Sequence, residues 1–144
     1  MELVPLGDLE LRYTALESIE YGAGGQIYGT MEGTLTGDTL DGELQLTNLA
    51  PRRPDNVNLP TLRGLLTTQD GATVYVELTG IATLRPADGA RVFVTAMTFR
   101  TGDPRYDWLN TVFGLVEGML DAVMVGGVAH ARVYRCTPTI GLPA

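Results

Sequence analysis

The sequence contains no lysine, so all ten of its basic residues are arginines, and 17 acidic residues outnumber them. The formal net charge at neutral pH is −7. Proteins that bind nucleic acids need a basic surface that displaces counterions from phosphates, and anionic membranes attract basic segments. The charge balance therefore argues against nucleic acid and against an anionic membrane surface as partners.

Long apolar runs are also missing. No segment approaches the run of about 18 apolar residues that a membrane-spanning helix needs, and residues 1–5 lack the positive start and apolar stretch of a signal peptide. Cys136 is the only cysteine, which excludes an intrachain disulfide. We interpret it as a small hydrophobe at a strand end. Together these absences predict a cytoplasmic protein.

The chain also lacks the usual signals of catalytic and metal sites. His130 is the only histidine, and no cysteine lies at a matching metal-ligand spacing. The G-x-S-x-G motif of hydrolases is absent. Residues 22–25 are rich in glycine but precede a strand pattern, so we interpret them as a flexible loop and not as a phosphate loop. We therefore expect no metal and no cofactor.

What the sequence does contain is a set of short alternating runs. With 144 residues, 44% of them hydrophobic, the chain can form one domain with one core. Period-two alternation predicts strands, and Asp103 followed by Pro104 predicts the start of a helical turn. The strands are expected at residues 9–16, 27–35, 40–47, 62–68, 73–82, 91–100, 111–117 and 122–134, and the turn at residues 103–110.

These elements predict an all-β fold, an antiparallel sandwich or barrel of about eight strands with one short helical turn. We expect the domain to cover residues 1–136. Residues 137–144, with two prolines, are expected to form a flexible C-terminal tail.

The hairpin of residues 27–47 separates apolar from polar residues. A two-residue turn at positions 37–38 places leucines on the face that we assign to the interior. Glu32 and Glu43 then lie opposite each other outside. We interpret them as surface acids, with paired acid–base carboxylates as the alternative.

The inward face of the same hairpin also carries glycines that indicate either a barrel bend or a ligand cavity. These are Gly29, Gly33 and Gly42.

The hairpin of residues 62–82 turns at Asp70 and Gly71, a strong hairpin signal. A two-residue turn there places Arg63 on the same face as Val74 and Val76, which we assign to the interior. A buried arginine must form an ion pair or bind an anion. Arg63 is therefore expected either to hold a substrate oxygen or to form an internal salt bridge.

Residues 91–100 are apolar on both faces. Arg91, Phe93, Thr95, Met97 and Phe99 share one face, and Val92, Val94, Ala96 and Thr98 share the other. Because a barrel buries only its inside, the presence of a second apolar face, whichever of the two points outward, predicts a subunit interface. We therefore expect a homodimer or a higher homo-oligomer.

Residues 99–110 hold the only tryptophan, Trp108, together with Arg105, Tyr106 and Asn110. A helical turn between two strands can plug one mouth of a barrel, where Trp108 and Tyr106 would form an apolar wall with polar tips. The plug either only closes the core or also contributes to a ligand site, since pockets are frequent at barrel mouths.

The same stretch, Phe-x-Thr-Gly-x-x-Arg-Tyr-x-Trp-Leu-Asn, resembles the signature of the domain of unknown function 3237 family, small bacterial and fungal proteins. The resemblance implies an antiparallel barrel similar to allene oxide cyclase and lipocalin-like barrels, without a settled activity. It also implies candidate ligand-binding residues at positions that the family tends to keep. These are Arg63, Arg105, Tyr106, Trp108 and Asn110. The chain departs from the pattern at Thr61, Leu78 and Arg100, which indicates a different ligand or a lost chemistry.

Three functions stay open. The first is a cofactor-independent isomerase or cyclase that acts on a small, mostly apolar carbonyl compound inside the barrel, with Arg63, Tyr106 and Asn110 as polarising donors. His130 or Glu77 would be the base, although a structural or cavity-lining role is the more common fate of a lone histidine. The second is a non-catalytic binder of such a molecule, and the third is a structural oligomeric barrel.

Overall fold

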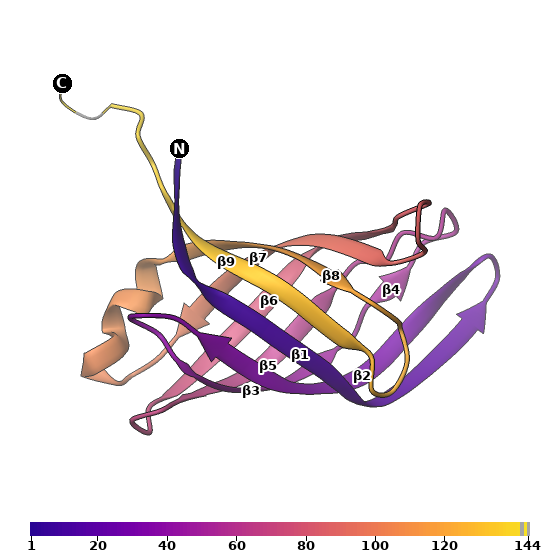
Figure 1. The fold of residues 1–144 in the computed structure, drawn as a ribbon, viewed down its shortest axis with the longest axis horizontal. Helices are drawn as coiled ribbons and strands as arrows, with labels where there is room; N and C mark the ends of the chain where they lie inside the picture. Colours follow the sequence, from indigo (N-terminus) through magenta and orange to yellow (C-terminus); the bar gives the residue numbers. More distant parts are fainter. Residues whose placement is uncertain (142, 144) are drawn as a thin grey trace.

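The computed structural model describes residues 1–141 and 143, and it shows a closed antiparallel β-barrel with one 3-10 helix (Figure 1). Eight long strands form the ring in the order β1-β9-β8-β7-β6-β5-β3-β2, and pairing of β1 with β2 closes it. The short strand β4 pairs with the end of β2. The predicted all-β antiparallel barrel is confirmed. The elements are β1 (Glu2–Tyr21), β2 (Gly24–Thr36), β3 (Gly42–Asn48), β4 (Pro51–Arg52), β5 (Thr61–Thr68), β6 (Thr73–Leu84), β7 (Arg91–Arg100), η1 (Pro104–Thr111), β8 (Phe113–Leu120) and β9 (Val128–Thr137).

Alternation along each strand builds one core inside the ring. In β7, Thr95, Met97 and Phe99 point inward and are buried, whereas Val94 on the other face is 59% exposed. The same period-two pattern buries Leu9, Leu11 and other residues of the remaining strands. The inward face of β7 is therefore the one that begins with Arg91.

Several strands differ in length from the prediction. β1 extends over 20 residues, well beyond the expected positions 9–16, because its exposed ends are held by pairing with β9 and β2 and not by burial. The glycine-rich residues 22–25 form no flexible loop. Tyr21 pairs with Gly24 across a tight turn in which Gly22 has φ +55°. β9 begins at Val128, since residues 122–127 form a loop.

The hairpin of β2 and β3 keeps the predicted faces but not the predicted register. Leu35 pairs with Gly42, so the connecting loop is longer than two residues, and Leu40 in that loop is buried in the core. The two-residue shift preserves side-chain direction. It places Glu32 opposite Gln45, so the predicted direct pairing of Glu32 with Glu43 is wrong.

The hairpin of β5 and β6 is shifted by one residue, which reverses one strand. Thr67 pairs with Thr73, and Gly71 at φ +90° occupies a left-handed position in a longer turn. A one-residue shift turns every side chain of a strand to the other face. Leu62 and Leu66 therefore point into the core, and the predicted inward orientation of Arg63 is wrong because its side chain lies on the exposed outer face.

The predicted helical turn is present as η1, which closes one end of the barrel (Figure 1). Asp103 caps the helix by accepting a hydrogen bond from the Arg105 backbone N at 3.0 Å, and Pro104 stands in its first turn. Leu109 is fully buried, and Tyr106 and Trp108 pack against the core. None of the helices within residues 1–141 and 143 is long and apolar enough to cross a membrane.

The C-terminal segment continues the barrel further than predicted. Thr137, the first residue of the expected tail, pairs with Glu2, and the N-terminal amine donates a hydrogen bond to Thr139 Oγ1 at 2.9 Å. Two positions of that tail, 142 and 144, lie outside the described residues.

Candidate ligand-binding cavity

The barrel contains an apolar cavity at the end opposite η1. The cavity has a volume of about 60 Å³, and the atom-free space widens to about 680 Å³ when its open mouth and the solvent there are included. Most of the wall is aliphatic or aromatic, supplied by inward side chains of the ring strands. A few polar side chains interrupt it, as is typical of small-molecule sites. The polar side chains are Tyr13, Asn48, Asn58, Arg91 and Thr95.

Tyr13 and Asn48 form a hydrogen-bonded pair on this wall. Asn48 Nδ2 donates to the Tyr13 hydroxyl oxygen at 2.9 Å, and Asn48 Oδ1 accepts from the Thr61 backbone N at 3.2 Å. Because the Tyr13 oxygen acts as the acceptor, its own O–H remains a donor for a third group. Burial raises the pKa of Tyr13, with the Asn48 hydrogen bond opposing. The phenol is therefore protonated at neutral pH and can donate a hydrogen bond.

The Tyr13 ring has room only because residue 29 is glycine. A Cβ on Gly29 would lie 2.7 Å from Tyr13 Cε1. Glycine is required at position 33 for a different reason, because a Cβ there would lie 1.8 Å from the Glu10 backbone oxygen on the neighbouring strand. One inward glycine thus shapes the cavity wall, and another permits the close approach of two strands.

Arg91 supplies the positive charge of the cavity. It is the first residue of β7, points inward and is only 9% exposed. Its Nη1 donates to the Asn56 backbone oxygen at 2.6 Å, and its Nη2 donates to Asn56 Oδ1 at 3.0 Å. Burial lowers the pKa of Arg91, and nearby Arg52 adds to this effect. A guanidinium nevertheless stays charged in proteins.

Two buried polar atoms on the wall have no hydrogen-bond partner among the described residues. They are Asn58 Oδ1 and Thr95 Oγ1. The Asn58 backbone is fully used, because it exchanges two hydrogen bonds with Ala82. Leaving a buried polar atom unpaired costs about 1–3 kcal/mol. Both residues line the same cavity, which makes their lack of a partner informative about function.

The structure places Arg63, Glu77 and His130 outside the barrel. Arg63 is exposed opposite Glu77, whose carboxylate accepts a hydrogen bond from Tyr75 Oη at 2.8 Å. His130 is 65% exposed, with its Nδ1 3.9 Å from Glu10 Oε2, and it neither packs in the core nor lines the cavity. None of the three lines the cavity, so a base or an anion anchor inside the barrel must come from other residues.

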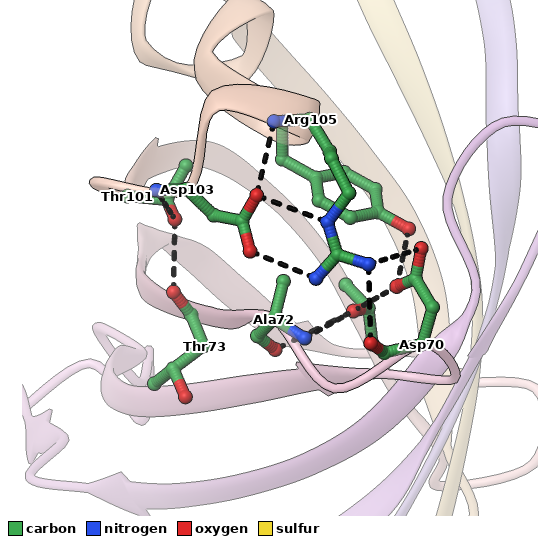
Figure 2. Close-up of polar contacts among 8 residues, drawn as sticks. Asp70, Ala72, Thr73, Thr101, Asp103 and Arg105 are labelled. Atoms are coloured by element: carbon green, nitrogen blue, oxygen red, sulfur yellow. Dashed lines mark hydrogen bonds and ion pairs between the residues drawn. The ribbon is translucent and has the colours of Figure 1, made fainter.

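Arg105 and Tyr106 hold η1 against the turn between β5 and β6. Figure 2 shows the Arg105 guanidinium between two carboxylates, with Nη2 2.9 Å from Asp103 Oδ2 and Nη1 3.1 Å from Asp70 Oδ2. Tyr106 Oη donates to Asp70 Oδ1 at 2.8 Å. Hydrogen bonds from Thr68 and Tyr106 lower the pKa of Asp70. This part of the family signature thus fastens the plug.

Asn110 and Trp108 complete the plug. The Asn110 side-chain amide accepts a hydrogen bond from the Thr101 backbone N at 2.8 Å and donates one to the Thr101 backbone oxygen at 2.9 Å. It thus pairs with the Thr101 backbone as the backbone of a neighbouring strand would. Trp108 is half-buried against the core and borders an outer groove beside the start of β1. The structure therefore brings the four predicted residues of this segment together at the closed end, away from the cavity.

Sequence reasoning did not single out the polar residues that line the cavity. A signal existed for three of them, because Tyr13 continues the alternation of Leu9 and Leu11, and Arg91 and Thr95 share a face with Met97. No periodicity marks Asn48 and Asn58, which border an irregular loop. Among residues 1–141 and 143, no cluster of histidine, cysteine or acidic side chains could hold a metal ion.

Comparison with known proteins places the chain in a family. The model of a protein family of unknown function, DUF3237, matches residues 1–135. The chain belongs to the DUF3237 family. The expected resemblance is confirmed, and the signature that carries it corresponds to the plug around η1 and its supports.

Solved structures share the DUF3237 barrel. A protein of Acinetobacter baumannii described as beta-barrel like has a TM-score of 0.78 and 20% identity, covering 93% of this chain and 94% of that one. A conserved protein of unknown function from Rhodopseudomonas palustris has a TM-score of 0.79 and 21% identity, covering 93% and 96%. A Penicillium herquei protein described as an enzyme has a TM-score of 0.63 and 21% identity, covering 92% and 93%. No curated protein sequence matches the chain significantly.

Proposed function

We propose that the cavity binds a small, mostly apolar molecule that carries a carbonyl or another polar oxygen. The observation that carries this proposal is the pair of buried atoms, Asn58 Oδ1 and Thr95 Oγ1, that lack partners among the described residues on a mostly apolar wall. The Thr95 hydroxyl can donate to a ligand oxygen, and Asn58 Oδ1 can accept from a ligand hydroxyl. A bound molecule with such groups would satisfy what the protein leaves unpaired.

The test is mass spectrometry of the purified protein under gentle and then denaturing conditions. We expect a small molecule to accompany the folded chain and to be released on denaturation. The variant Ala129→Leu fills part of the cavity with a larger side chain and should lose this molecule. Ala87→Leu makes the same change on an exposed loop and should retain it.

The proposal fails under a defined outcome. If the wild type retains no molecule, and if neither β-ionone nor acetophenone raises its melting temperature, the cavity is not a binding site for such compounds. A ligand that binds only the folded state stabilises that state by mass action. Even a weak ligand therefore raises the melting temperature when its concentration is high enough.

A second candidate function is an isomerase or cyclase acting in the same cavity, and the Tyr13 hydroxyl favours it. A neutral phenol with a free proton, held in place by Asn48, can polarise a carbonyl as its oxygen gains negative charge. Arg91 can add electrostatic stabilisation. No carboxylate or imidazole of the described residues lines the cavity, so this reaction would rely on donors and shape.

Isomerisation and cyclisation conserve mass, which gives this second function its own assay. The molecule released from the protein is incubated with fresh protein, and chromatography looks for a new compound of unchanged mass. Tyr13→Phe should lower turnover at least tenfold while the variant still binds the molecule. A compound that is bound but never converted would leave binding as the function.

A further inference from the structure

We propose that the molecule bound in this cavity is an organic anion, an apolar body with a carboxylate that pairs with Arg91 at the mouth. The inference rests on the proposed function and names the chemical class of its ligand. It follows from a comparison of Arg91 with the other arginines of the chain.

The arginines near Arg91 each have an acid of their own. Arg52 pairs with Glu20, Arg53 with Asp55, and Arg85 with Asp88. All three lie at the same end of the barrel as Arg91. Arg52 ends β4, Arg53 follows it, and Arg85 is in the loop between β6 and β7. The protein thus neutralises even those arginines that water could solvate.

Arg91 is the exception within the described part of the chain. It is the only buried arginine there, and no carboxylate lies within ion-pairing distance of it. A buried charge is costly unless it is paired. The chain has 17 acidic residues, so carboxylates that could pair with an arginine are plentiful. The missing partner at this one position is therefore best supplied by a ligand.

Asn56 orients the guanidinium without neutralising it. Two oxygens of Asn56 accept from Nη1 and Nη2, which occupies part of the donor fork and leaves other N–H groups available. Asn56 has φ +66°, and its backbone N donates to the Arg53 oxygen at 2.9 Å, which fixes this turn. A pre-oriented fork matches the planar oxygens of a carboxylate.

The rest of the cavity fits the body of such an anion. Next to Arg91 on the inward face of β7 stands Phe93, and Leu120 is the cross-strand partner of Arg91. Ile27 of β2 and Leu62 of β5 also line the cavity. No acidic side chain of the described residues lines this space. An apolar acid could therefore bury its tail while its charge stays at Arg91 and meets no repulsion from the walls.

The experiment uses a matched set of probes and calorimetric titration of the intact protein. The probes are 4-phenylbutanoate, 4-phenylbutan-1-ol and 4-phenylbutylamine, which share a body and differ in the charge of the head. We expect the carboxylate to bind about tenfold or more tightly than the alcohol, because hydrogen bonds to charged groups are stronger than neutral ones. The amine should bind weakest.

The variant Arg91→Met removes the charge and keeps the length of the side chain. It should abolish the preference for the carboxylate and retain binding of the alcohol. Arg63→Met is the matched control, because it changes net charge equally at an exposed position of the outer face. Should Arg91→Met not fold, salt titration of the wild type replaces it, since added salt weakens pairing with a charged probe more than binding of a neutral one.

The outcomes separate this inference from the proposed function. Equal binding of alcohol and carboxylate, or a carboxylate preference that survives Arg91→Met, overturns the anion while leaving a binding cavity. Failure of all three probes, together with absence of any co-purified molecule, overturns the cavity as a binding site and the anion with it.

Discussion

Gly29 lies so close to the ring of Tyr13 that a single added carbon on Gly29 would approach Tyr13 Cε1 to 2.7 Å. Gly29 is in β2 and Tyr13 in β1, the two strands whose pairing closes the barrel. The position of the Tyr13 hydroxyl against Asn48 therefore depends on the absence of a side chain on the neighbouring strand.

Gly29→Ala tests this dependence. The substitution should displace the Tyr13 ring and destabilise the protein by about 1–3 kcal/mol, the usual cost of overpacking a core. It should also weaken binding in the cavity. Urea unfolding measures the free energy of unfolding. Gly102→Ala is the control, because a Cβ there meets nothing within 4 Å and should leave stability and binding unchanged.

Asn110→Ala tests whether the plug is separate from the cavity. Loss of the two hydrogen bonds to the Thr101 backbone should lower the free energy of unfolding by about 1 kcal/mol, because water can partly replace them at this exposed site. Hydrogen exchange should increase in residues 101–112. Affinity for cavity ligands should stay unchanged. A large loss of affinity with intact folding would instead favour a ligand role for Asn110.

Asp88 gives a prediction for pH. Hydrogen bonds from Arg85 and the Ala90 backbone N lower the pKa of Asp88 from 3.8 to about 2. A lowered folded-state pKa stabilises the protein above the unfolded value, and this contribution is lost as pH falls toward the folded value. The stability difference between wild type and Asp88→Asn should therefore be full above about pH 4.8, one unit above that unfolded value, and should shrink between there and pH 2.

Thermal unfolding across this pH range provides the measurement. Asp38→Asn is a suitable control because Asp38 is exposed and has no side-chain hydrogen bond among the described residues. Its difference from the wild type should vary less with pH. A constant difference for Asp88→Asn would show that the ion pair with Arg85 contributes nothing to stability.

The outer face of the barrel carries the prediction of a homodimer. Ile81 and Val94 are direct cross-strand partners, 52% and 59% exposed, on the strands β6 and β7. We expect light scattering to give a dimer mass at micromolar concentration. Val94→Glu places a charge in this patch and should shift the mass toward the monomer, whereas Thr39→Glu, at an exposed position of the loop between β2 and β3, should not. A wild-type monomer would contradict the prediction.

The fold was largely predictable because alternation and turn residues report directly on strand faces. The helical turn was predictable for the same local reason, since Asp103 and Pro104 define a helix start. The length of the strands was harder to predict, because backbone pairing extends β1 through exposed residues that show no alternation.

The site was harder because it depends on register. Parity placed Arg63 inward, but Gly71 lies in a longer turn that reverses the strand of Arg63. Parity left the inward face of residues 91–100 unassigned, because both faces of that strand are apolar. The partners of Tyr13 and Arg91 come from the strand ends and loops near residues 48 and 56. Such distant contacts leave no periodic signal in one sequence.

The meeting of the two chain ends has a practical consequence. Glu2 pairs with Thr137, and both ends leave the barrel on the side of η1 (Figure 1), while the mouth beside Arg91 faces the other way. Protein tethered to a surface through its amino terminus would therefore present the mouth to solution. A sensor surface or a reporter domain could therefore be joined to the amino terminus without obstructing ligand entry at the mouth.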